Sequence, residues 1–171
     1  MTEELNYKAY LSISQKKFGI YLLDKKNLIN IYKDELNLEN DNDQINYNHL
    51  SNFLENNVFK IEKLIGHFLK SIFVIIENKK ILNFSIGISK KNYGEKITKS
   101  YLESCLTELN DLFKENYQRN KIMHFIINRY LIDGVNYTSF GEEIDGENMC
   151  LEANFISAPN VLIKEISDVL E

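Results

Sequence analysis

Residues 81–89 have the sequence Ile-Leu-Asn-Phe-Ser-Ile-Gly-Ile-Ser, in which apolar and small polar side chains alternate. Successive side chains of a β-strand point to opposite faces, so this pattern predicts a strand with one apolar face directed at a core. The other face is small and polar, can accept a close neighbour, and consists of Asn83, Ser85, Gly87 and Ser89.

The segments before and after this strand predict further strands and helices. Three short β-like runs fall between residues 7 and 34, and another strand is expected at 72–77. Apolar residues recur three and four positions apart over 48–70, which predicts an amphipathic helix. A second helix is expected to begin at Thr98 or Ser100, both of which are suitable caps, and to end near Asn120.

The last third of the chain alternates between strand and turn signals. The long apolar run at 122–132 predicts a mostly buried strand, and Asp133 and Gly134 end it with a turn. A loop that contains Gly141 and Gly146 follows, then a strand at 149–157 and a helix that begins after Pro159. The expected fold class is therefore α+β, an antiparallel or mixed sheet with two to three packing helices.

Composition limits the classes of function. A length of 171 residues is room for one ordinary domain, or for one domain and a small subdomain. A net charge of −5 gives no cationic surface, so nucleic acid is not an expected partner. Cys105 and Cys150 are too few for a disulfide framework, and no stretch approaches the ~18 apolar residues of a membrane span. We therefore expect a cytoplasmic protein without a direct membrane span.

Catalytic motifs do not occur in the sequence. It has no dinucleotide-binding glycine pattern, Walker A loop, G-x-S-x-G, H-E-x-x-H or paired C-x-x-C. His49, His67 and His124 are scattered, and we expect core or half-exposed histidines rather than catalytic ones. We expect no catalytic residue, cofactor or metal. One acidic run has oxygen ligands suited to a divalent cation, although solvated loop charge is the simpler interpretation; it consists of Glu142, Glu143, Asp145 and Glu147.

Four segments follow one another in a definite order. They are IEKLIGHFLKSIFVIIENKKILNFSIGISKK (61–91), GEKITKSYLESCLTELNDLF (94–113), HFIINRYLIDG (124–134) and FGEEIDGENMCLEANFISAP (140–159). In this order and spacing the chain resembles FtsA, the bacterial cell-division family of actin homologues, over roughly residues 7–165. The pilus assembly family PilM is similar, but Asp133, Gly134, Gly141 and Gly146 fit FtsA better.

The resemblance implies a domain organisation. It assigns residues 1–36 to the N-terminal strands of a partial actin-like subdomain. It assigns 37–135 to a strand-helix-strand-strand module, the inserted interaction subdomain of FtsA. Residues 136–171 are then a returning strand and a C-terminal helix that pack on the N-terminal strands. In the family, this module contacts neighbouring FtsA subunits and other division proteins.

The sequence departs from the family where a phosphate loop is expected. Residues 11–15 read Leu-Ser-Ile-Ser-Gln, with neither the acid nor the glycine of the family's Asp-x-Gly-Thr loop. We also expect the second ATPase lobe of the family to be absent. The expected function is therefore a non-enzymatic FtsA-like protein-interaction module that acts in cell division or related cytoskeletal assembly and does not bind ATP by itself. Its contact surfaces would be sheet edges and the small polar face, its partners division or filament-forming proteins, and a homo-oligomer is compatible with such edges.

Two other functions stay open from the sequence. Strand-helix-strand-strand modules also resemble small-molecule-binding domains, in which case His124, Tyr130 and Glu152 would be the polar groups of a pocket. An enzyme with an acidic metal site near residues 142–147 is the third candidate. A pocket on which these groups converge would favour the second function, and a filled core would disfavour it.

Overall fold

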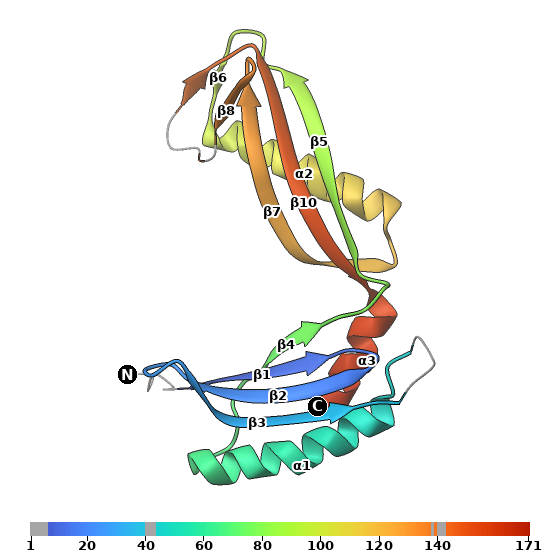
Figure 1. Ribbon diagram of the computed structural model, residues 1–171. Helices are drawn as coiled ribbons and strands as arrows, with labels where there is room; N and C mark the ends of the chain where they lie inside the picture. Colours follow the sequence, from blue (N-terminus) through green and yellow to red (C-terminus); the bar gives the residue numbers. More distant parts are fainter. Residues whose placement is uncertain (1–6, 40–43, 138, 140–142) are drawn as a thin grey trace. The chain divides into compact units, whose positions relative to one another are not determined.

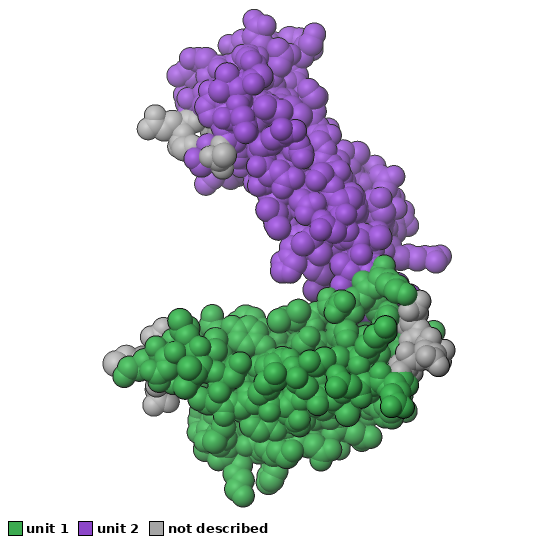
Figure 2. All heavy atoms as spheres, viewed as in Figure 1, with its two compact units in different colours: residues 1–79, 164–171 green, residues 80–163 purple. Residues whose placement is uncertain are grey.

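The computed structural model describes residues 7–39, 44–137, 139 and 143–171. The chain divides into two compact units, residues 1–79 with 164–171 and residues 80–163, which Figure 2 shows in different colours. Each unit contains one four-stranded sheet, and the described residues include three helices. The α+β class predicted from the sequence, with antiparallel and mixed sheets, is confirmed.

The first unit is built on a sheet with the strand order β3-β2-β1-β4 (Figure 1). An antiparallel meander is formed by β1 (Tyr7–Ile13), β2 (Lys17–Asp24) and β3 (Ile29–Asn37). A short edge strand, β4 (Phe73–Ile76), pairs in parallel with β1. Parallel neighbours need a crossover connection, which α1 (Tyr47–Ile65) supplies along one face of the sheet.

The ends of α1 are set by its caps. Asn46 accepts a hydrogen bond from the backbone N–H of His49 at 3.1 Å, which satisfies one of the free donors of the first turn. Gly66 adopts a left-handed conformation with φ 79° and ends the helix after Ile65, before the predicted end near residue 70. The buried side chains of the helix share one face, and they are Leu50, Phe53, Leu54, Asn57 and Ile61.

The structure divides the chain at 79/80 and 163/164, whereas the resemblance implied boundaries at 36/37 and 135/136. The difference concerns α1, which the resemblance assigned to the module formed with later strands. The apolar face of α1 instead covers the core face of the meander, where Leu11, Ile20 and Leu22 are fully buried. The helix α1 therefore packs on the sheet that precedes it in the chain, not on the strands that follow it.

The second unit contains a sheet with the order β5-β10-β7-β8. The central strand β10 (Asn148–Pro159) is antiparallel to both β5 (Leu82–Lys91) and β7 (Asn120–Ile132). The outer strand β8 (Val135–Tyr137) pairs with the end of β7. The helix α2 (Lys99–Asn116) connects β5 to β7, so the principal elements follow the order strand, helix, strand, strand.

Three smaller elements complete the chain. The strands β6 (Lys96–Ile97) and β9 (Ile144–Asp145) pair with each other. The helix α3 (Asn160–Leu170) follows β10 directly, and its residues from Lys164 onward belong to the first unit. There the Tyr47 hydroxyl donates to Oε2 of Glu165 at 2.8 Å. In the described part of the chain, no helix combines the length and apolar character needed to cross a bilayer.

One face of the second sheet packs against α2. Thr98, one of the two predicted caps, accepts a hydrogen bond from the Tyr101 N–H at 3.2 Å, and the helix ends at Asn116 rather than near residue 120. The rings of Phe113 and Phe155 stack with centroids 5.2 Å apart and planes 7° apart. The core of this unit also contains Ile88, Ile97, Leu102, Cys105, Leu109, Ile132, Met149, Leu151 and Ala153.

The strand β7 is more exposed than the sequence predicted. Ile132 is its one buried residue, while Met123 and Ile126 are 41% and 49% exposed. The helix α2 covers one face of the sheet, so the other face of β7 stays in contact with solvent, and β8 pairs only with its last three residues. The prediction of a mostly buried strand is therefore wrong, because an apolar run does not by itself tell a buried strand from a half-exposed one.

Two glycines of the second unit provide a matched test of packing. A Cβ at Gly146 would overlap the Cγ2 methyl of Ile132, which is buried. We expect Gly146→Ala to lower the free energy of unfolding by about 1–3 kcal/mol, because the core must shift to accept the methyl group. At Gly87 a Cβ would lie 3.8 Å from the Leu151 carbonyl oxygen, so Gly87→Ala should change the stability by less than about 1 kcal/mol. Urea unfolding followed by circular dichroism measures both, and equal destabilisation would contradict this account.

Candidate interaction surface

The small polar face predicted on β5 lies on the side of the second sheet that α2 does not cover. The intervening apolar residues of β5 point the other way and pack in the core. The register with β10 places Ser85 opposite Asn154 and Gly87 opposite Glu152. The four predicted residues, Asn83, Ser85, Gly87 and Ser89, are all exposed.

Side-chain hydrogen bonds connect the three long strands across this face. Nδ2 of Asn154 donates to Oδ1 of Asn83 at 2.8 Å, and Oγ of Ser85 donates to Oδ1 of Asn154 at 3.4 Å. Asn128 lies in a bulge of β7 and donates to Oγ of Ser85 and to Oε1 of Glu152, both at 3.4 Å. These hydrogen bonds therefore hold the polar side chains in defined positions on the open face.

One ion pair borders this network. Nε of Arg129 donates to Oε2 of Glu152 at 2.8 Å, and a second guanidinium nitrogen lies 2.8 Å from the same oxygen. The two residues are directly opposite in the β7–β10 register. An exposed pair of this kind adds at most about 1 kcal/mol to stability, so its main effect is to orient the two side chains. The open face thus presents amides and hydroxyls together with one neutralised charge pair.

The predicted turn residues Asp133 and Gly134 join β7 to β8. Both have positive φ, 48° and 81°, the conformation of a type I′ hairpin turn. The Asp133 carboxylate also accepts hydrogen bonds from the backbone N–H groups of Glu147 at 3.0 Å and Asn148 at 2.8 Å. These bonds lower the pKa of Asp133. The turn therefore holds the first residues of β10 in place.

The acidic run considered for metal binding does not form a cluster in the described residues. Oε2 of Glu143 accepts a hydrogen bond from Nζ of Lys96 at 3.1 Å, and Asp145 belongs to β9. Within residues 7–39, 44–137, 139 and 143–171, no group of three His, Cys, Asp or Glu side chains is placed to hold an ion. Glu142 and Gly141 lie outside the described residues.

The residues considered for a small-molecule pocket do not converge. His124 and Glu152 lie on the open face of the second sheet, as their register with β10 and β7 shows. Tyr130 lies on the opposite face and packs against the core. His49 and His67 belong to the first unit, where the His67 ring lies 3.0 Å from the Tyr7 hydroxyl.

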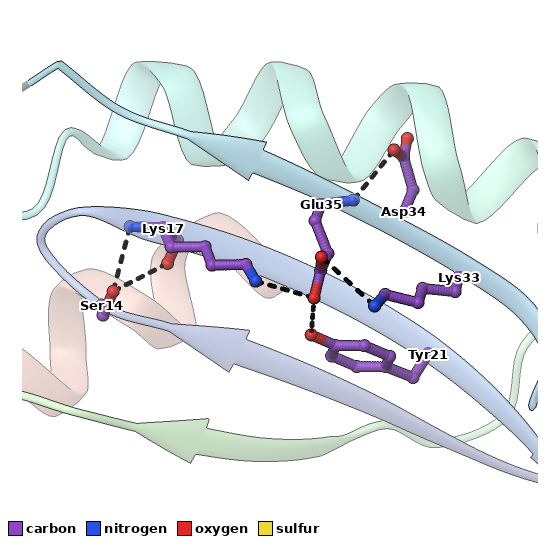
Figure 3. Close-up of polar contacts among 6 residues, drawn as sticks. All are labelled: Ser14, Lys17, Tyr21, Lys33, Asp34 and Glu35. Carbon is purple, nitrogen blue, oxygen red and sulfur yellow. Dashed lines mark hydrogen bonds and ion pairs between the residues drawn. The ribbon is translucent and has the colours of Figure 1, made fainter.

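The turn between β1 and β2 stands where the resemblance implied an altered phosphate loop. Oγ of Ser14 accepts a hydrogen bond from the backbone N–H of Lys17 at 3.0 Å and donates to the Lys17 carbonyl oxygen at 3.0 Å (Figure 3). It also accepts a hydrogen bond from the backbone N–H of Lys16 at 3.3 Å. These N–H groups are therefore already bonded within the turn.

The open face of the first sheet holds a charged network that the sequence did not predict (Figure 3). Oε1 of Glu35 accepts from the Tyr21 hydroxyl at 2.6 Å and lies 2.8 Å from Nζ of Lys17, and Oε2 lies 3.3 Å from Nζ of Lys33. Gly19 is opposite Glu35, and a Cβ there would collide with the Tyr21 ring. These residues come together through the pairing of β2 with β3, and no spacing along the sequence indicates that they form a network.

This network predicts acid sensitivity in the first unit. Hydrogen bonds from Lys17 and Tyr21 lower the pKa of Glu35 from its ordinary 4.5 to about 2. A carboxyl with a lower pKa in the folded state stabilises the fold above its ordinary pKa, and this contribution is lost as the pH falls from about 4.5 to about 2. We expect Glu35→Gln to flatten the decline in unfolding free energy across that range. The exposed Glu55 of α1 provides the control, Glu55→Gln, and the prediction fails if both variants keep the wild-type slope in urea unfolding.

Two solved structures that align with this chain are described here. No family model matches the sequence, and neither does any curated protein. The cytoplasmic domain of EpsL, an inner-membrane component of the type II secretion system of Vibrio cholerae, aligns with a TM-score of 0.48 and 11% identity over 96% of this chain and 52% of that chain. A Bacteroides thetaiotaomicron protein described as having an actin-like ATPase fold and unknown function aligns with a TM-score of 0.35 and 15% identity over 98% of this chain and 50% of that one. The chain spans about half the length of both solved chains.

Proposed function

We propose that this chain is a non-enzymatic protein-interaction module that acts in the cytoplasm in bacterial cell division or a related cytoskeletal assembly. The observation that carries the proposal is the uncovered face of the second sheet, where β5, β10 and β7 share one hydrogen-bonded polar surface. The resemblance of the sequence to FtsA supports the cell-division context.

The chemistry of this face suits a protein partner. Its donors and acceptors are mainly neutral amides and hydroxyls, which are tied to one another and therefore lose little conformational entropy on binding. Ile126 lies opposite Asn154 and is 49% exposed, so the polar array has an apolar neighbour. Protein interfaces combine an apolar centre with polar groups that can form direct hydrogen bonds.

The turn at Ser14 supports the proposal that the chain does not bind ATP by itself. Phosphate loops bind anions through free backbone N–H groups. Here the N–H groups of Lys16 and Lys17 bond to the Ser14 hydroxyl.

The interaction surface is tested by a matched pair of asparagine variants. Asn154 lies at the centre of the open face, whereas Asn116 lies at the exposed end of α2. We expect affinity capture from cells of the source organism, with the whole chain as bait, to recover a division or filament-forming protein. Asn154→Arg should reduce that recovery by about tenfold or more, because a long cation disrupts the array, and Asn116→Arg should not. The proposal is contradicted if no such protein is recovered or if both variants recover as much as the wild type.

Nucleotide binding is tested separately by calorimetry. We expect titration of the chain with ATP and magnesium to give no heat beyond dilution, because the turn donors are already bonded. Circular dichroism of the same sample controls for folding. A micromolar binding isotherm would refute this part of the proposal.

A further inference from the structure

The outer edge of β5 presents a row of backbone groups that point away from β10. The N–H of Asn92 donates to the Glu147 carbonyl oxygen at 2.7 Å, and this pairing continues the antiparallel register of β5 with β10. Residues of an antiparallel strand bond alternately to the two sides, so the even-numbered residues bond to β10. The outward N–H and C=O groups therefore belong to Asn83, Ser85, Gly87, Ser89 and Lys91.

The other sheet edges of the described chain carry features that hinder strand addition. On β3, Leu38 donates to the Lys16 carbonyl oxygen, so by the same alternation the Glu35 N–H points outward. That N–H donates to Oδ1 of Asp34 at 2.9 Å and is thereby capped by a charged side chain. The strand β4 has four residues, and β7 has two register shifts against β10 and is partly covered by β8. Natural proteins protect edges with charges, bulges and short strands of these kinds.

The edge of β5 has none of these protections along most of its length. It pairs with β10 over ten consecutive residues without a register shift, and it contains no proline. Its charged residues are confined to Lys90 and Lys91 at the end. The side chains of Asn83 and Ser85 bond to Asn154 of the neighbouring strand, so they do not cap the outward backbone.

We propose that β5 binds an extended segment of a partner protein as an added strand, and that this segment carries acidic residues at the end that lies beside Lys91. The proposal rests on the proposed interaction function and names the chemistry of the partner. Nζ of Lys90 pairs with Glu108, whereas Lys91 is exposed on the open face, and residues 80–94 contain no acid. Backbone hydrogen bonds would supply affinity, and Lys91 would select an acidic end.

A second copy of the chain fits this edge less well. Residues 80–94 contain no acid, so β5 of a second copy would bring no carboxylate to Lys91 of the first. An acidic end on the partner segment supplies that opposite charge.

Binding of a defined peptide tests the proposal. The probe is fluorescein-labelled Asp-Asp-Val-Thr-Val-Thr-Val-Thr-Val-Glu-Glu, and the control peptide has lysine at its four acidic positions. Fluorescence anisotropy with the whole chain should show at least about tenfold tighter binding of the acidic peptide, with a difference that shrinks as salt is added. Hydrogen exchange should show added protection of the Ser85, Gly87 and Ser89 amides.

Matched variants separate the edge from the charges. Ser85→Pro removes one outward N–H without breaking the ladder to β10 and should bind the acidic peptide about tenfold more weakly than Ser85→Ala, which lacks the same hydroxyl but keeps that N–H. Lys91→Glu should weaken binding of the acidic peptide, and Lys121→Glu on β7 should have no effect.

Three results of these experiments would overturn the proposal. They are equal affinity for both peptides, binding that Lys91→Glu does not change, and peptide-dependent protection of amides outside β5. Sedimentation that shows a dimer of the chain dissociated by Ser85→Pro would also overturn it. The Asn154→Arg capture experiment measures recovery of a cellular partner and does not use this peptide, so failure of the peptide to bind at the edge leaves the proposed function standing.

Discussion

Each four-stranded sheet has a helix along one face, and this one-sided cover determines where polar side chains lie. In the second sheet, β10 is bonded on both sides, and its residues alternate between a core face and an open face. Leu151 and Phe155 are fully buried against α2, while Glu152 and Asn154 lie on the other side. Because no element of the described residues forms a second layer on the open face, its polar groups bond to one another across the strands. The same constraint places the Glu35 network on the open face of the first sheet.

The sequence predicts the features that depend on neighbours in the chain. The alternation in β5, the cap at Thr98 and the turn at Asp133 and Gly134 each follow from a few consecutive residues, and the α+β class follows from their order. The burial of β7 does not, because an apolar run has the same composition whether one or both faces of the strand are covered. The extent of cover is decided by α2, which lies elsewhere in the sequence.

Features that depend on strand register are the least accessible from sequence. The Tyr21 hydroxyl reaches Glu35 because β2 and β3 pair in one register and because Gly19 leaves room for the ring. A shift by one residue would turn every side chain of β3 to the other face. The bonds from Glu147 and Asn148 to the Asp133 carboxylate likewise join residues fourteen and fifteen positions apart. No spacing in the sequence identifies either arrangement.

The open face and the free edge of the second sheet are consequences of the same residues. In an antiparallel strand, residues with outward backbone groups all direct their side chains to one face. On β5 these residues are mostly small, and two of them bond inward to Asn154. On β3 the equivalent residues include Lys33 and Glu35, which form the charged network. A strand added to β5 would therefore lie beside Ser85 and Gly87 and extend the polar face by one strand. Edge and face then form one continuous recognition area, in which backbone bonds set the position of the partner and side chains select it.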